Sequence, residues 1–143
     1  NLLKFNKLEN VIVTNCDVML NHNYDQILQH HINKKNHITL VGAMKNFTIP
    51  YGVCGFDRQG RLKSIKEKPN YDYLINSGFY IIKSSLFKLI PKNEYYDMDK
   101  FILGALKKNK IKIGIYPVHE EALKDIGQWD YYNQSLSRLR NKN

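Results

Sequence analysis

Two aspartates stand at the junctions of apolar and polar segments, where a carboxylate can do chemistry. Asp17 follows the apolar residues 11–14, and Asp125 precedes Ile126 and Gly127. A carboxylate is costly to bury alone, so in such places it is hydrogen-bonded, caps a helix or holds a cation. For Asp125 the ordinary role is to cap a following helix through the helix dipole. The residue types alone leave these alternatives open.

Glu67 and Lys68 form a charged pair just before Pro69. Charged side chains in a loop are ordinarily solvated. The functional alternative is that Lys68 binds a phosphate as a point charge while Glu67 accepts hydrogen bonds from a pair of hydroxyls.

Two further segments combine polar side chains with glycine. Tyr51 and Gly52 either begin a strand or let a ligand approach the backbone closely, which glycine permits. Asn76 and Ser77 place polar side chains in front of an apolar strand, with the same two interpretations.

A strand–helix–strand unit must position Asp17. Residues 11–14 predict an apolar strand, residues 24–32 have apolar side chains at helical spacing, and residues 38–41 predict a second strand. Such a unit implies parallel pairing of the two strands through a right-handed crossover. Ligands collect beyond the carboxyl ends of strands in open sheets of this kind, and Asp17 stands at such an end.

The remaining residues predict a hairpin followed by alternating strands and helices. Residues 51–56 and 62–65 alternate around the polar turn 57–60, which is typical of a hairpin. The other expected elements are a strand at 75–82, a short serine-capped helix at 84–90, a helix beginning at Asp97 or Asp99, a strand at 111–116 and a terminal helix at 128–140. Together they predict one mixed α/β layer structure.

The composition is that of one globular domain, with 143 residues of which 43% are hydrophobic and 24% charged. No apolar run approaches the roughly 18 residues that a membrane helix needs, and no leader segment opens the chain. Cys16 and Cys54 lie in apolar runs without metal-ligand spacing, and the histidines lack it too. We therefore expect no membrane contact, reduced buried thiols and a cytoplasmic protein.

The net charge of +9 invites a nucleic-acid interpretation. Against it, only four of the cations are arginines and the lysines are scattered, whereas base readout depends on arginine and on clustered basic faces. A lysine-rich background composition explains the charge equally well. We expect no nucleic-acid partner.

Six segments, in this order, resemble the sugar-1-phosphate nucleotidyltransferases, also called nucleotide-sugar pyrophosphorylases. They are residues 13–17 (Val-Thr-Asn-Cys-Asp), 49–53 (Ile-Pro-Tyr-Gly-Val), 67–69 (Glu-Lys-Pro), 76–80 (Asn-Ser-Gly-Phe-Tyr), 89–92 (Leu-Ile-Pro-Lys) and 125–127 (Asp-Ile-Gly). The resemblance covers nearly the whole chain and is closest to bacterial mannose- or glucosamine-type phosphate guanylyltransferases.

The resemblance implies a Rossmann-like (GT-A-like) α/β domain with a mixed sheet and flanking helices. Residues 1–143 would be the carboxyl-terminal portion of this single domain, with its amino-terminal part missing. Such an enzyme joins a nucleoside triphosphate, here GTP, to a sugar 1-phosphate and releases pyrophosphate.

The resemblance also assigns roles to the candidate residues. It implies that Asp17 and Asp125 hold Mg²⁺ near the α-phosphate, and that Glu67 contacts sugar hydroxyls while Lys68 contacts the sugar phosphate. The implied substrate pocket also contains Tyr51, Gly52, Asn76 and Ser77. Because an anionic phosphate attacks an anionic phosphate, the cation and Lys68 must offset their repulsion, and no protein nucleophile or general base is required.

Three departures from the family pattern matter. Cys16 stands where the commoner motif has glycine, and Leu123-Lys124 replaces an aromatic–aliphatic pair. The glycine-rich triphosphate loop, Gly-x-Gly-Thr-Arg-Leu, does not occur in these residues. We therefore expect little or no activity from this chain alone, and we expect an incomplete sheet edge to favour self-association into a homo-oligomer. A non-catalytic module that binds sugar phosphates or regulates is the alternative function.

Overall fold

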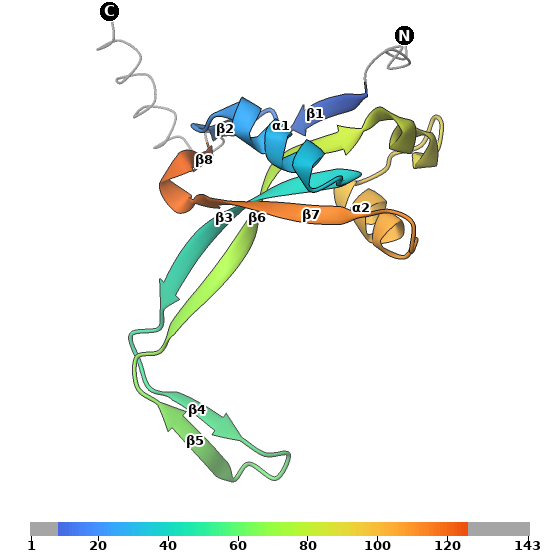
Figure 1. Cartoon of the computed structure of the whole chain (residues 1–143). Helices are drawn as coiled ribbons and strands as arrows, with labels where there is room; N and C mark the ends of the chain where they lie inside the picture. Colours follow the sequence, from blue (N-terminus) through green and yellow to red (C-terminus); the bar gives the residue numbers. More distant parts are fainter. Residues whose placement is uncertain (1–8, 126–143) are drawn as a thin grey trace, which may run out of the picture.

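The computed structural model describes residues 9–125 and shows a body with a long arm (Figure 1). In chain order the elements are β1 (Asn10–Thr14), β2 (Val18–Leu20), α1 (Tyr24–Asn33), β3 (Ile38–Thr48), β4 (Val53–Phe56), β5 (Leu62–Lys66), β6 (Asn70–Lys83), the 3-10 helix η2 (Ser84–Leu89), α2 (Met98–Leu106), β7 (Ile113–His119), the 3-10 helix η3 (Glu120–Ala122) and β8 (Leu123–Asp125). No helix in this range is long and apolar enough to cross a membrane.

The central sheet has four strands in the order β1-β6-β3-β7. β6 runs antiparallel to both β1 and β3, while β3 and β7 are parallel. The predicted mixed α/β fold is confirmed. The predicted pairing of β1 with β3 is wrong, because the two strands run in the same direction but β6 lies between them.

The burial of β6 gives the physical reason for this insertion. Its segment from Phe79 to Ile82 is buried on both faces, so the centre of the sheet is the place where all four side chains leave water. Phe79 and Ile81 pack with Ile27 of α1 in one core cluster, whereas the alternate residues pack with α2 in a second. Helices therefore cover both faces of the sheet.

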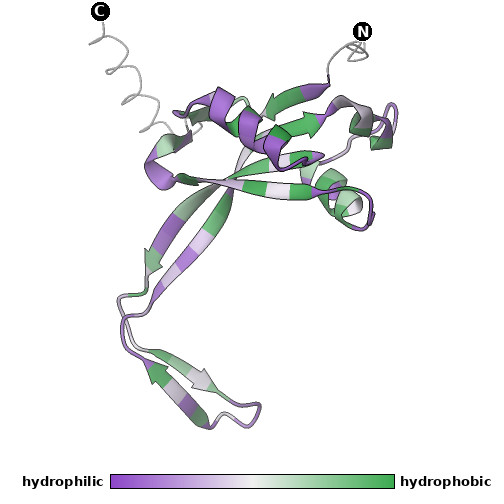
Figure 2. Ribbon diagram, viewed as in Figure 1, coloured by the Kyte–Doolittle hydropathy of each residue, from purple (hydrophilic) through white to green (hydrophobic). Residues whose placement is uncertain are grey.

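β3 and β6 continue beyond the body as a two-stranded ribbon, which leads into the β4–β5 hairpin (Figure 1). The hairpin is confirmed, but β3 and β6 are longer than the predicted strands 38–41 and 75–82. The backbone ladder continues to the pair Thr48 and Asn70 although the side chains there are polar. Figure 2 shows the resulting mixture of hydrophilic and hydrophobic residues along the arm.

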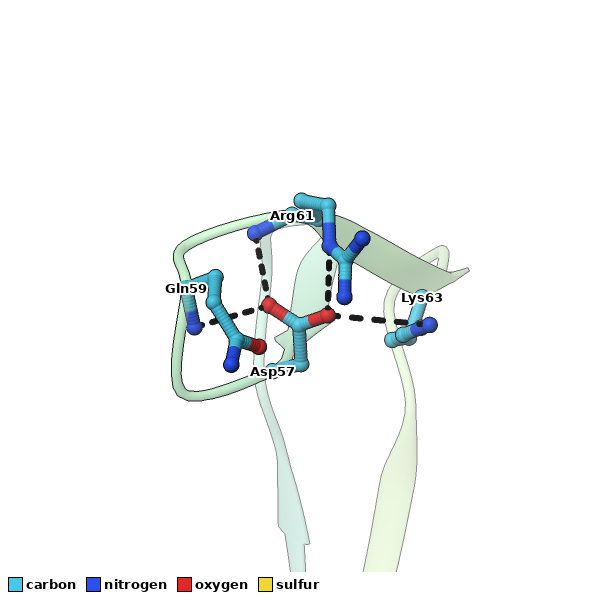
Figure 3. Close-up of polar contacts among 4 residues, drawn as sticks. All are labelled: Asp57, Gln59, Arg61 and Lys63. Atoms are coloured by element: carbon cyan, nitrogen blue, oxygen red, sulfur yellow. Dashed lines mark hydrogen bonds and ion pairs between the residues drawn. The ribbon is translucent and has the colours of Figure 1, made fainter.

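The turn at the end of the hairpin is organised by Asp57 (Figure 3). Its carboxylate accepts hydrogen bonds from the backbone N–H groups of Gln59 and Arg61, both at 3.0 Å, and from Arg61 Nε at 2.9 Å. The backbone hydrogen bond from Arg61 is the first cause that lowers the pKa of Asp57. Gly60 adopts φ of 77°, which a non-glycine residue rarely does.

Two smaller predictions, the buried cysteines and the serine cap, are wrong, and the terminal helix is not tested. Cys16 and Cys54 are free but exposed, because Cys16 lies in the turn after β1 and β4 pairs only with β5 within residues 9–125. The segment after Lys83 is a 3-10 helix without a side-chain cap, and α2 begins after Asp97, which also makes no capping hydrogen bond. The predicted terminal helix at 128–140 lies outside the described residues.

His31 of α1 is buried, at 1% exposure, within a complete polar network. Its Nδ1 lies 2.8 Å from Thr39 Oγ1 and its Nε2 lies 3.1 Å from Asn10 Oδ1. Because Asn36 Nδ2 donates to Thr39 Oγ1 at 3.0 Å, we assign a Thr39 hydroxyl that donates to Nδ1 and a neutral ring that donates through Nε2. Burial lowers the pKa of His31 from its ordinary 6.5, and the Lys83 charge lowers it further.

Acidification from about pH 7 to about pH 5.5 is therefore expected to lower the free energy of unfolding. In this range the unfolded chain binds a proton at His31 that the folded chain resists, so stability rises with pH across the window and falls on acidification. Carboxyl groups titrate at lower pH. Urea midpoints at the two pH values check this prediction. An unchanged midpoint, or NMR evidence that His31 titrates like a free histidine, would contradict it.

Candidate functional site

A cavity of about 980 Å³ opens where β1, β3 and β6 meet the start of α2 and the segment after β7. Its lining is mostly polar and contains both acidic and basic side chains. The lining residues are Asn15, Asp17, Val18, Ala43, Lys45, Ile75, Asn76, Ser77, Gly78, Tyr80, Asp97, Met98, Asp99, Lys100, Glu120 and Leu123. Three of the predicted site residues, Asp17, Asn76 and Ser77, are among them.

Asp17 reaches the cavity from the turn between β1 and β2, at the carboxyl end of β1. The turn is attached to β6 by the Asn15 N–H, which donates to the Gly78 carbonyl at 3.0 Å. Capping of the next helix is done by Asn23, whose side chain accepts from the backbone N–H of Asp25 at 2.9 Å. Asp17 is exposed, and within residues 9–125 its carboxylate forms no hydrogen bond or ion pair.

The backbone of Asp125 lies beside this turn, although it is far from Asp17 in sequence. β8 pairs antiparallel with β2, and in that register Asp125 is the partner of Val18, the residue after Asp17. Mg²⁺ commonly binds through one or two carboxylates together with water and phosphate oxygens. Asp17 fits that donor set, whereas residues 9–125 contain no cluster of three or more acidic, histidine or cysteine side chains for a metal.

Asn76, Ser77 and Gly78 form part of the cavity wall at an irregularity in the β3–β6 ladder. The buried Ser77 hydroxyl donates to the Val41 carbonyl at 2.8 Å, and Asn76 Nδ2 donates to the Tyr80 hydroxyl at 2.8 Å. Gly78 has φ of 74°, and a Cβ there would lie 2.6 Å from the Asn15 amide. These contacts stabilise the cavity wall, and the hydrogen bond of the Ser77 hydroxyl to Val41 gives this side chain a structural role.

The other predicted site residues, Tyr51, Gly52, Glu67 and Lys68, lie on the arm. A Cβ on Gly52 would lie 3.1 Å from Glu67 Oε2, so these two residues adjoin. Lys45 is the last residue of β3 that lines the cavity, and the end of the ladder at Thr48 is three residues farther along, or roughly 10 Å at about 3.4 Å per residue. The structure therefore does not bring Glu67 and Lys68 together with Asp17.

The cavity also contains charged residues that sequence reasoning did not assign to it: Lys45, Asp97, Asp99, Lys100 and Glu120. The sequence around Asp97 and Asp99 predicts the start of a helix and does not indicate a cavity. Lys100 Nζ lies 3.4 Å from Asp97 Oδ2, and a hydrogen bond from the Tyr95 side chain is the main cause that lowers the pKa of Asp97. Lys45 had no local signal.

A mixed sheet covered by helices on both faces places this chain in the α/β class, and the polar cavity opens at the carboxyl end of β1, where such folds commonly bind ligands. Within this class, the family model described as "Nucleotidyl transferase" matches residues 1–142, so the chain belongs to the nucleotidyl transferase family. This result confirms the resemblance seen in the sequence.

A curated relative named "Putative mannose-1-phosphate guanyltransferase", from Sulfolobus acidocaldarius, is 28% identical over 139 residues, which are 95% of this chain and 37% of the relative. HddC from Yersinia pseudotuberculosis has a similar fold, with a TM-score of 0.60, 21% identity and coverage of 93% of this chain and 56% of that one. A Bacillus anthracis structure described as a "Putative Glucose-1-Phosphate Thymidylyltransferase" has a TM-score of 0.60 at 14% identity, covering 97% of this chain and 58% of that one. The chain thus spans little more than a third of the curated relative.

Proposed function

We propose that this chain supplies the sugar-phosphate pocket and the metal-binding aspartates of a sugar-1-phosphate nucleotidyltransferase that uses GTP. The observation that carries the proposal is the β2–β8 ladder, which places the backbone of Asp125 next to the turn that presents Asp17 to the cavity. Membership of the nucleotidyl transferase family supports it. The name of the Sulfolobus relative favours a guanylyl group and a hexose 1-phosphate.

In the proposed reaction, an oxygen of the sugar phosphate attacks the α-phosphate of the triphosphate in line, and pyrophosphate leaves. Asp17 and Asp125 would hold Mg²⁺, which when bound offsets the repulsion between the two anions. The polar wall at Asn76 orients the sugar phosphate. No side chain needs to act as nucleophile or base, because the attacking oxygen is already ionised at neutral pH.

Glu67 and Lys68 can contact the sugar hydroxyls and the phosphate as proposed only if the arm bends toward the cavity that contains Asp17. Their separation from Asp17 is the observation that favours the second candidate, a module that binds or senses sugar phosphates without catalysis.

Exposed apolar residues along the arm, such as Phe56 and Ile65, favour association with further protein, including a second copy. We further propose a cytoplasmic protein, where its two free cysteines stay reduced.

An assay of pyrophosphate release from GTP, mannose 1-phosphate and Mg²⁺ tests the proposed function. We expect little or no release from the 143-residue chain and robust release from a protein in which this chain is joined to a glycine-rich triphosphate loop. A joined protein that binds mannose 1-phosphate but releases no pyrophosphate would support the non-catalytic module. Robust synthesis by the chain alone would contradict the expectation that it lacks a necessary part.

A further inference from the structure

One face of the arm continues the wall of the cavity. Ala43, Lys45 and Ile75 line the cavity, and the antiparallel register pairs Ala43 with Ile75 and Lys45 with Tyr73. Directly opposite residues share a face of a ribbon, as do residues two apart along a strand. The next pair on this face, Phe47 with Tyr71, therefore continues the cavity wall outward along the ribbon that Figure 1 shows leaving the body.

This face is aromatic, with a lysine at its junction with the cavity. The rings of Phe47 and Tyr73 are 5.9 Å apart at 63°, and Tyr71 stacks on Tyr73 at 6.4 Å. Phe47 is 43% exposed and Tyr73 is 56% exposed. The opposite face differs, because its polar pairs bond to each other: Asn46 Nδ2 donates to Asp72 Oδ1 at 2.8 Å. On the ribbon of β3 and β6, the exposed rings thus lie on the face that meets the cavity.

Lys45 is the cavity cation available to a ligand. Of the two lysines in the lining, Lys100 is 3.4 Å from the Asp97 carboxylate. Lys45 forms no ion pair within residues 9–125. Its Nζ lies 5.4 Å from the centre of the Phe47 ring. An ammonium beside an aromatic ring keeps its other hydrogens free for a phosphate oxygen.

We propose that this face binds the sugar 1-phosphate, with Lys45 on the phosphate and the rings of Tyr73 and Phe47 against the sugar. The proposal rests on the proposed function and adds residues to its substrate pocket. In a sugar 1-phosphate the phosphate is bonded directly to the ring carbon, so charge and ring are immediate neighbours, as the Lys45 ammonium and the Phe47 ring are. A nucleotide has a whole ribose between phosphate and base, which fits this spacing less well.

Titrations of the full 143-residue chain with mannose 1-phosphate, glucose 1-phosphate, inorganic phosphate and GMP, followed by NMR, test the proposal. Lys45→Met is expected to raise the dissociation constant about tenfold for whichever sugar 1-phosphate the wild type binds more tightly. It is also expected to weaken the binding of inorganic phosphate. Tyr73→Leu is expected to lower the affinity for the sugar 1-phosphate about threefold and to leave the affinity for inorganic phosphate unchanged. Tyr73→Phe keeps the ring and should bind like the wild type.

Lys88→Met is the matched control, because Lys88 is an exposed lysine of η2 outside the cavity lining. Circular dichroism and the urea midpoint show whether each variant folds. If the wild type binds a sugar 1-phosphate and neither Lys45→Met nor Tyr73→Leu changes the affinity, the proposal fails and the proposed function stands. If Tyr73→Leu weakens only GMP, the face binds a base and the proposal is overturned. A wild type that binds neither sugar 1-phosphate overturns both.

Discussion

Replacement of Asp17 with alanine is expected to lower the turnover of the proposed nucleotidyltransferase by about a hundredfold or more. The carboxylate lines the cavity and is exposed. Helix α1 is capped by Asn23 instead, so Asp17 has no capping role to lose. The variant should therefore keep its stability within about 0.5 kcal/mol of the wild type, because exposed substitutions without partners cost little.

Turnover and urea unfolding of the same preparation check this prediction. Mn²⁺, followed by its paramagnetic broadening of NMR signals, gives a readout that does not depend on turnover, and Asp17→Ala should weaken its binding. Asp25→Ala is a suitable control, since Asp25 is an exposed aspartate in the first turn of α1 and does not line the cavity. Turnover near that of the wild type would show that Asp17 is not a ligand of the metal.

The largest effect on stability is expected for Ile81→Ala, at about 3–4 kcal/mol. Ile81 has 0% exposure and lies in the central strand β6, where its neighbours in the ladders are Ile12 of β1 and Thr39 of β3. It packs with Ile27 and other residues of the cluster beneath α1. Truncation leaves a cavity that the surrounding strands, held by two ladders, cannot close.

Urea unfolding of Ile81→Ala and of Leu103→Ala measures this difference. Leu103 is in α2 but is 58% exposed, so its truncation should cost less than about 1 kcal/mol. Equal losses for the two variants would show that β6 is not the centre of the core.

Local sequence patterns predicted β1, α1, the hairpin and the buried parts of β3 and β6, but they did not predict the short strands β2 and β8. The alternation of residues around Asp57 predicts the hairpin because the turn depends on its own side chain and backbone, as the Asp57 hydrogen bonds show. The apolar run that ends at Asp17 predicts a strand with a carboxylate at its end, and the structure places Asp17 in the cavity. The ordered motifs were sufficient for the family.

Burial was harder to predict, since it depends on what covers a segment. Cys54 lies in an apolar run, but its strand belongs to an arm that has no second layer within residues 9–125, and the thiol is exposed. Lys45 shows the reverse problem. It looks like an ordinary exposed lysine in the sequence, and it becomes a cavity residue only because β3 extends past β7 beside β6.

The sequence by itself determined the buried parts of the central strands, the hairpin turn and the family of this protein, because each depends on the spacing of residues that are close together or on motifs in a fixed order. The tertiary structure decided which strands are neighbours. β6 takes the centre of the sheet since it buries both faces there, and the β2–β8 ladder brings the backbone of Asp125 next to Asp17. Such pairings between distant segments depend on the total apolar surface buried by the whole fold, which no local pattern contains.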